Sequence, residues 1–357
     1  MSKIGLITIH DTVNYGSLLQ TYATCRMLRQ LGHDAELIDY RCEAIEKREK
    51  VPTLKNCRSL KDVARYVCWG RALSRKYRNM WRFMRENMTV SRPYTRENIA
   101  EANRDYDTFV VGSDIVWSKR ITGNDDTYYL DFAADEKRKI AFSSSVGTIW
   151  EERDRPHVEK LLRRFDRISV REWMAARWIR ELYGIEADTT CDPTMLFDGD
   201  FWRSYAEKTA DKQGGYVLIY AVNQDRKNIL DGIRYAKEHG KEARFINFYT
   251  PVPGTKTVRP DTPGQWLSLF LNADTVFSAS YHGLLFSLYF RKNVFFYNGR
   301  GETSRMASLA EETGIRHREG TEENLRADAP IDFDKVDRVL AEKRAASIAI
   351  LKRNLEG

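Results

Sequence analysis

The sequence predicts an α/β protein built from two Rossmann-like, doubly wound domains that face a cleft. Short apolar runs typical of buried strands alternate with helical segments, and this happens twice, in two series separated by a polar stretch. The chain has 357 residues, which is more than one hydrophobic core usually takes. Two parallel sheets, each covered by helices on both faces, fit both observations.

The first series opens with a β-α-β unit. Ile4–Ile9 is an almost continuous apolar run, which predicts a strand buried on both faces of a sheet. Apolar residues then recur at helical spacing from Leu18 to Leu31, and Gly32 predicts the end of that helix. Ala35–Ile38 follows as the second strand. Further strands are predicted at TFVVG from Thr108, KIAFSS from Lys139 and RISV from Arg167, with helices over 155–165 and 173–182.

The second series follows a polar stretch between Leu196 and Gly215, and we place the domain boundary near residue 212. The first domain is then 1–212, with a basic helical insert at 43–100, and the second is 213–330. Residues 331–357 contain a helical pattern from Phe333 to Leu355 that is expected to pack back on either domain. The strands of the second domain are predicted at YVLIYA from Tyr216, ARFINFY from Ala243, TVFSA from Thr275 and VFFY from Val294.

Within the insert, residues 58–92 combine many arginines and lysines with aromatic residues. Leu73, Tyr77, Trp81, Met84 and Met88 fall at helical spacing, so an ordinary helix whose apolar stripe packs on the first domain explains the segment. A peripheral contact with an anionic membrane surface is the alternative. Its residues would be the basic Arg71, Arg75, Arg78, Arg82 and Arg85 beside Trp69 and Trp81.

Composition narrows the class of protein. Apolar residues make up 42% and charged residues 31%, which predicts a soluble globular protein rather than a disordered one. The net charge of +7 is compatible with an anionic substrate, a membrane surface or nucleic acid. No run of about 18 apolar residues and no secretory signal pattern occurs, so we expect a cytoplasmic protein with at most peripheral membrane contact.

The cysteines predict neither disulfides nor a zinc site. They are five in number and scattered, without a C-x-x-C pair, which favours a reducing cytoplasm. No cluster of histidine, cysteine and carboxylate residues suggests a metal, so we expect none. The five are Cys25, Cys42, Cys57, Cys68 and Cys191.

Candidate site residues follow the strands, because functional groups of open α/β sheets collect at the strands' carboxyl ends. Asn14-Tyr15-Gly16-Ser17 joins the first strand to the first helix, where free N–H groups attract an anion or sugar hydroxyls. An ordinary turn is the alternative, since no dinucleotide or Walker motif is present. Asp114, in Gly112-Ser113-Asp114, either accepts a hydrogen bond from a substrate hydroxyl or caps the next helix.

Three further candidates carry positive charge or a titratable ring. Arg171, directly after RISV, either binds a carboxylate or phosphate or forms an ion pair with Glu172 or another acid. His282, in Ser280-Tyr281-His282-Gly283, lies between an apolar run and an apolar helix, and is the candidate acid or base. Arg300 and Arg305, beside the next helix, predict an anion clamp.

Together these motifs resemble the polysaccharide pyruvyl transferase family. The resemblance spans residues 4–315 and depends on the order and spacing of the motifs. They are IHDTVNYGSLLQTYA near the start, YDTFVVGSDIVWS from Tyr106, YYLDFA from Tyr128, KIAFSSSVG from Lys139, ISVRE from Ile168, CDPTMLF from Cys191, NADTVFSASYHGLLFSLYF from Asn272 and SRMASLAEETGI from Ser304.

The resemblance implies a GT-B-like fold and transfer of pyruvate from phosphoenolpyruvate to a saccharide acceptor, with release of phosphate. It implies that His282, Arg171 and Arg305 are catalytic, that the first domain is the acceptor side and the second the donor side, and that no cofactor is needed beyond the donor substrate. A lipid-linked acceptor would explain a membrane contact through residues 58–92, whereas nucleic-acid binding leaves His282 and the strand-end arginines without a role. A GT-B glycosyltransferase that uses a nucleotide sugar is the alternative.

The sequence departs from the family's motifs in two places. The usual GSDQVWN is here Gly112 to Ser118 with Ile115 and Ser118 in place of glutamine and asparagine, and the usual SFHG has Tyr281 in place of phenylalanine. The first departure removes two polar side chains from a loop expected on the acceptor side. The acceptor sugar is therefore not specified by the resemblance.

Overall fold

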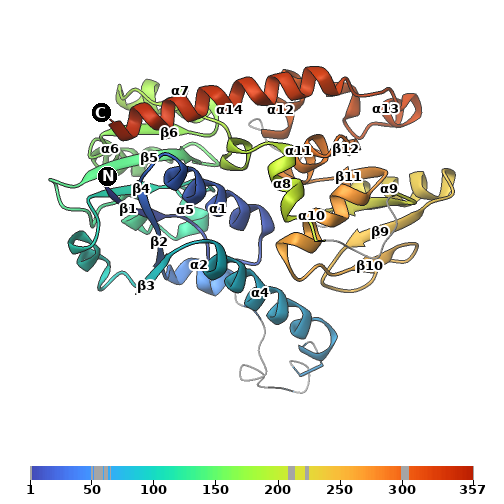
Figure 1. Ribbon diagram of the computed structural model, residues 1–357, viewed down its shortest axis with the longest axis horizontal. Coiled ribbons are helices and arrows are strands. Elements are labelled where there is room, and N and C mark those ends of the chain that lie inside the picture. Colours follow the sequence, from blue (N-terminus) through green and yellow to red (C-terminus); the bar gives the residue numbers. More distant parts are fainter. Residues whose placement is uncertain are drawn as a thin grey trace. The chain divides into compact units, whose positions relative to one another are not determined.

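The computed structural model describes residues 2–49, 51, 59, 63–64, 66–207, 214–221, 225–298 and 305–356 (Figure 1). The chain forms two compact units. The first contains Met1–Lys50, Trp81–Phe197 and Glu342–Gly357, and the second contains Val51–Met80 and Asp198–Ala341. Each unit has its own parallel sheet.

The sheet of the first unit has the strand order β3-β2-β1-β4-β5-β6-β7, and all of its pairings are parallel. This order places a topological switch point between β1 and β4, where Ile4 pairs with Thr108. Core strands such as β4 are buried at every residue, as their continuous apolar runs require. The strands are β1 (Lys3–Ile7), β2 (Asp34–Tyr40), β3 (Val90–Tyr94), β4 (Thr108–Val111), β5 (Arg138–Ser144), β6 (Arg167–Val170) and β7 (Asp188–Thr189).

The helices of the first unit connect these strands. Helix α1 begins where the side chain of Asn14 accepts hydrogen bonds from the backbone N–H groups of Gly16 and Ser17. Helix α7 ends at Gly184, which adopts the left-handed conformation that glycine favours. The α-helices are α1 (Tyr15–Gln30), α2 (Glu43–Arg48), α5 (Lys119–Thr122), α6 (Arg155–Leu162) and α7 (Trp173–Tyr183), and the 3-10 helices are η3 (Ile99–Arg104), η4 (Asp126–Tyr129), η5 (Glu152–Asp154) and η6 (Pro193–Leu196).

The second unit has a sheet of order β10-β9-β8-β11-β12, again with parallel pairings, and its switch point lies between β8 and β11. The strands are β8 (Tyr216–Tyr220), β9 (Glu242–Ile246), β10 (Lys256–Val258), β11 (Thr275–Ser278) and β12 (Asn293–Phe296). The helices are α8 (Gly199–Tyr205), α9 (Arg226–Glu238), α10 (Pro263–Asn272), α11 (Tyr281–Tyr289), α12 (Arg305–Thr313), η7 (Arg316–Arg318) and α13 (Glu322–Ala327).

Side chains along β8 point alternately to the two faces of its sheet, and a helix covers each face. Val217 and Ile219 join the core cluster that includes Ile229 of α9. Tyr220, which points to the opposite face, has its ring 5.7 Å from the rings of Trp266 and Phe270 in α10. Because apolar side chains cover it on both faces, every residue of β8 is buried.

Two long helices contain residues of both units. Helix α4 (Arg71–Asn87) follows the π-helical turn η2 (Tyr66–Gly70), and α14 (Phe333–Glu356) is near the end of the chain. Within the first unit, the Ser347 hydroxyl of α14 accepts a hydrogen bond from the Cys191 backbone at 2.9 Å. Within the second, Arg291 pairs with Asp334 and Asp337 of the same helix.

The predicted strands and the last helix are present close to their expected bounds. The expected boundary near residue 212 lies outside the described residues, and the compact units divide after Phe197. The reason is α8, whose Trp202 contacts Phe286 of α11 with a ring distance of 5.4 Å. The segment 43–100, expected to be helical, also contributes the edge strand β3.

Candidate functional site

Polar side chains gather at the switch point of each sheet, past the carboxyl ends of the central strands. In the first unit they come from the start of α1 and the turn after β4. In the second unit they come from the start of α11, directly after β11. These are the positions at which open α/β sheets bind ligands.

In the first unit, Ser17 and Asp114 are joined by a hydrogen bond from the Ser17 hydroxyl to the Asp114 carboxylate. The other oxygen of Asp114 accepts from the Ile115 backbone at 2.8 Å. The backbone of Asp114 has φ 81°, a strained value for a residue other than glycine, and such strain is concentrated at functional sites. Asp114 does not cap a helix, because α5 begins after Ser118.

The four residues of the α1 turn differ in what they can offer a ligand. Asn14 is exposed. Tyr15 is 1% exposed, so its side chain belongs to the core rather than to a binding surface. Gly16 and Ser17 are buried, and their backbone N–H groups bind the Asn14 side chain at 2.9 and 3.4 Å. Asn14 and the Ser17–Asp114 pair are therefore the polar groups that this turn presents.

Arg171 is placed by a buried ion pair. Its side chain is 3% exposed, and its guanidinium donates to the Asp192 carboxylate at 2.8 Å and to the Ser113 hydroxyl at 3.1 Å. The Ser113 carbonyl accepts a 2.6 Å hydrogen bond from the Thr8 hydroxyl. Arg171 thus holds the turn that carries Asp114. The predicted pairing with an acid is present, and Asp192, in the CDPTMLF motif, was not singled out from the sequence.

A second buried network in the first unit was also not predicted. His10 is 2% exposed, with Nδ1 3.1 Å from the Thr8 carbonyl and Nε2 3.1 Å from the Asp39 carboxylate. The two ring nitrogens therefore face one backbone carbonyl and one carboxylate. The position of His10 directly after the first strand was the signal that could have identified it.

Arg41 connects this network to Asp11. Its guanidinium binds the Asp39 carboxylate through two nitrogens, at 2.8 and 2.9 Å, and Asp11 at 2.9 Å. Asp11 also accepts a hydrogen bond from the indole N–H of Trp81 at 2.9 Å. The network therefore ties the carboxyl ends of β1 and β2 together beside the α1 turn.

We expect Asp39→Asn to lower the free energy of unfolding by about 2–4 kcal/mol near neutral pH, because it removes one partner from a buried charged network. Burial raises the pKa of the Asp39 carboxyl, and hydrogen bonds from His10 and Arg41 lower it. The lowering is the larger effect, so the pKa of Asp39 lies below its ordinary value. The stabilisation is therefore complete above about pH 4 and is lost as the pH falls below that value.

Denaturant unfolding of both proteins at several pH values measures this difference. The matched control is Asp34→Asn, on the same strand but exposed. A gap between wild type and Asp39→Asn that stays constant down to pH values well below 4 would contradict the assignment.

The second unit brings three predicted residues together. His282 is the second residue of α11, half-buried, and its ring is edge-on to that of Tyr281 at 5.5 Å. The guanidinium of Arg305, the first residue of α12, lies over the Tyr281 ring at 5.0 Å. The next residue is Gly283, where a side chain has no room because a Cβ would collide with the Ser278 hydroxyl and approach Tyr220 to 2.8 Å. Arg300 lies outside the described residues.

This cluster is suited to an anion. The backbone N–H groups in the first turn of a helix have no partners within the helix, and the helix dipole makes this end positive. Ser280, at the N-cap of α11, makes no capping hydrogen bond with its side chain. Arg305 adds a full positive charge beside Tyr281. A phosphate or carboxylate is the ligand that such a helix start and an arginine bind together.

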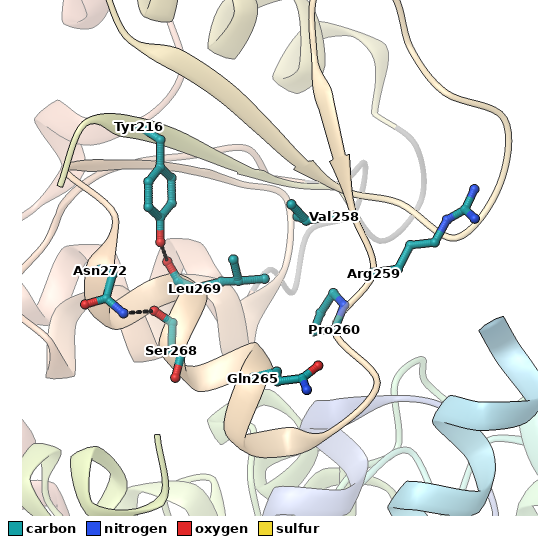
Figure 2. A pocket seen from close by; sticks show the side chains of 8 residues that line it. All are labelled: Tyr216, Val258, Arg259, Pro260, Gln265, Ser268, Leu269 and Asn272. Atoms are coloured by element: carbon teal, nitrogen blue, oxygen red, sulfur yellow. Dashed lines mark hydrogen bonds between the residues drawn. The ribbon is translucent and has the colours of Figure 1, made fainter. Parts of the chain in front are cut away.

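A separate pocket in the second unit has a volume of about 230 Å³ (Figure 2). Two of its polar side chains are occupied by backbone carbonyls, since Tyr216 donates to Leu269 at 2.7 Å and Asn272 to Ser268 at 3.0 Å. Its lining residues come from β8, α10 and the end of β10, and none from α11 or α12. They are Tyr216, Val258, Arg259, Pro260, Gln265, Ser268, Leu269 and Asn272. This pocket is therefore distinct from the His282 cluster.

Two departures from the family's motifs have structural roles. Ile115 packs against Gly147, where an added Cβ would approach it to 2.7 Å, and Ser118 precedes α5.

The described part of the chain contains no group of three or more histidine, cysteine or carboxylate residues arranged to hold a metal. No helix among the described residues is long and apolar enough to cross a membrane.

Solved structures resemble the chain over almost its whole length. UDP-GlcNAc 2-epimerase from Neisseria meningitidis, bound to UDP-GlcNAc, matches with a TM-score of 0.56 and 10% identity over 99% of this chain and 100% of that one. UDP-N-acetylglucosamine 2-epimerase from Rickettsia bellii matches with a TM-score of 0.55 and 11% identity, over 99% of this chain and 96% of that one. An alpha-glucosyltransferase in complex with UDP matches with a TM-score of 0.51 and 9% identity, over 98% of this chain and 95% of that one.

At these identities the likeness establishes the fold alone, and it confirms the predicted class of two Rossmann-like, GT-B-like α/β domains. That the domains face a cleft stays a prediction.

No curated protein sequence matches the chain. Residues 14–299 match the family model described as Polysaccharide pyruvyl transferase.

Proposed function

Because the chain belongs to the polysaccharide pyruvyl transferase family, we propose that it transfers pyruvate from phosphoenolpyruvate to a saccharide as a ketal and releases phosphate. The observation that carries this proposal is the cluster of His282, Tyr281 and Arg305 at the start of α11. It combines a proton donor with an anion site, and phosphoenolpyruvate needs both. We propose that the donor binds in the second unit.

The proposed reaction begins with protonation of the donor's methylene carbon by His282, which converts that carbon to a methyl group and leaves the neighbouring carbon electron-poor. A sugar hydroxyl attacks this carbon, and the carbon–oxygen bond to phosphate breaks. A second hydroxyl of the same sugar then closes the ketal. Of the two hydroxyl protons, one replaces the proton that His282 gave to carbon, and the other leaves with the phosphate. Arg305 and the first turn of α11 neutralise the phosphate and carboxylate during these steps.

The acceptor side is proposed for the first unit. The exposed Asn14 offers its side-chain N–H donors, since its oxygen caps α1, and the half-exposed Asp114 offers a carboxylate acceptor; sugar hydroxyls bind both kinds of group. Arg171 supports this side through Ser113, and its predicted part in donor binding stays a prediction. We place the reaction in the cytoplasm, in keeping with the free thiols of Cys25, Cys42, Cys68 and Cys191.

The test measures phosphate release from phosphoenolpyruvate with galactose-, glucose-, mannose- and N-acetylhexosamine-terminated acceptors. We expect release that depends on one acceptor and yields a product heavier by the pyruvate ketal. Transfer from a nucleotide sugar, with no release from phosphoenolpyruvate, would favour the glycosyltransferase alternative that shares this fold.

We expect transfer to continue in excess chelator, because Arg305 and the helix N-terminus supply the positive charge that the donor needs. The measurement is the initial rate before and after treatment with EDTA, followed by addition of Mg²⁺ or Mn²⁺. Activity that disappears with EDTA and returns with either ion would contradict this expectation.

A further inference from the structure

Helix α4 presents a row of arginines along one face. Arg71, Arg75, Arg78, Arg82 and Arg85 are all exposed, and their spacing of four, three, four and three residues places them on one side of the helix. At 1.5 Å per residue the row is about 21 Å long. We call these five residues the arginine row.

Much of this charge has no counter-charge among the described residues. Arg75 pairs with Asp261, and Arg85 lies over the Trp81 ring at 5.5 Å. Arg71, Arg78 and Arg82 form no ion pair with any described residue. Packing of the helix requires none of these three, because its buried side chains, which include Leu73, Met80 and Met84, lie between the arginines in sequence. The predicted apolar stripe and the arginine row are thus two faces of one helix.

Exposed apolar side chains precede the row in the sequence. Val63 is 41% exposed, and Val67, in the π-helical turn directly before Arg71, is 60% exposed. In the turn η2, Tyr66 and Trp69 are half-buried. Aromatic residues of this kind favour the boundary between lipid headgroups and acyl chains.

We propose that the arginine row and Val67 dock the protein on an anionic lipid surface. The arginines match the negative charge of the headgroups, and Val67 enters the interface beside them. A nucleic-acid backbone would use the arginines but would leave the exposed valines in water, so lipid accounts for more of the surface. The purpose of this contact rests on the proposed function, because a lipid-linked saccharide acceptor is presented at such a surface.

The test is sedimentation of the full chain with vesicles of phosphatidylcholine, with and without phosphatidylglycerol, and no donor or acceptor. The variant Arg71→Gln, Arg78→Gln, Arg82→Gln removes the three arginines without an ion pair. The control Arg26→Gln, Arg180→Gln, Arg338→Gln removes the same charge from other exposed helical arginines. Since each basic residue contributes about fivefold, we expect about 100-fold weaker binding to anionic vesicles for the row variant, and little change for the control.

Binding of the wild type must also fall as the ionic strength rises, and Val67→Ser must weaken it. Equal binding to both kinds of vesicle, or an equal loss in both triple variants, would overturn the proposal. So would binding to DNA, but not to vesicles, that the row variant loses. Thermal unfolding verifies that the variants fold. Transfer to a water-soluble acceptor is expected to be unchanged in the row variant, so a failure here is distinct from a failure of the proposed reaction.

Discussion

His282→Gln is expected to reduce pyruvyl transfer by about 100-fold or more while the protein stays folded. The size follows from general acid catalysis, which typically contributes about 10²- to 10⁴-fold. Glutamine keeps a hydrogen-bonding side chain of similar reach but cannot deliver a proton to carbon. His282 is half-buried at the start of α11, so the substitution opens no large cavity in the core. The loss is therefore expected in kcat, with little change in the KM for phosphoenolpyruvate.

The matched control is His317→Gln in the same unit, whose ring nitrogen is 3.1 Å from the Pro330 carbonyl. Steady-state kinetics and thermal unfolding of both variants measure the effect. Near-normal turnover by folded His282→Gln would return this histidine to a structural role.

Arg305→Lys is expected to raise the KM for phosphoenolpyruvate about tenfold or more, because lysine keeps the charge but loses the forked, two-bond contact. A hydrogen bond to a charged group contributes about 1.5–3 kcal/mol, and 1.4 kcal/mol corresponds to tenfold in affinity. The lysine also loses the planar contact of the guanidinium with the Tyr281 ring. The effect is expected mainly on KM, in contrast to that of His282→Gln.

Arg326→Lys, at an exposed site on α13, is the control for this substitution. Donor affinity is read from KM and from phosphoenolpyruvate titration followed by tryptophan fluorescence. Wild-type affinity in Arg305→Lys would place the anion site elsewhere in the protein.

The sequence predicted those parts of the fold that local pattern determines. β1 and β8 were recognisable because a strand buried on both faces is a continuous apolar run. β3 was missed because its sequence, VSRPY, belongs to an edge strand and contains polar residues and a proline. The division after Phe197 depends on contacts of Trp202 with a helix more than eighty residues later, which no local pattern contains.

The places of candidate residues in the fold were predictable where they follow a strand end. His282 and Asp114 lie four and three residues after β11 and β4, at the carboxyl ends of those strands as expected, and their roles stay predictions. Of the two acids that Arg171 contacts, Glu172 was predicted and lies 3.4 Å from its guanidinium. Asp192 was not predicted, because it is 21 residues further along and only the fold brings it to Arg171. The same holds for His10 and Asp39, which are 29 residues apart. Long-range pairs of buried polar groups are properties of the topology rather than of a sequence window.

The most direct test of the proposed reaction follows the methyl group of the product. The transfer is carried out in D₂O with phosphoenolpyruvate and the best acceptor, and the product is analysed by NMR and mass spectrometry. Protonation of the methylene carbon predicts a pyruvate ketal whose methyl group carries one deuterium, formed together with one phosphate. A product that contains no ketal, or a ketal methyl group without deuterium, would contradict the account.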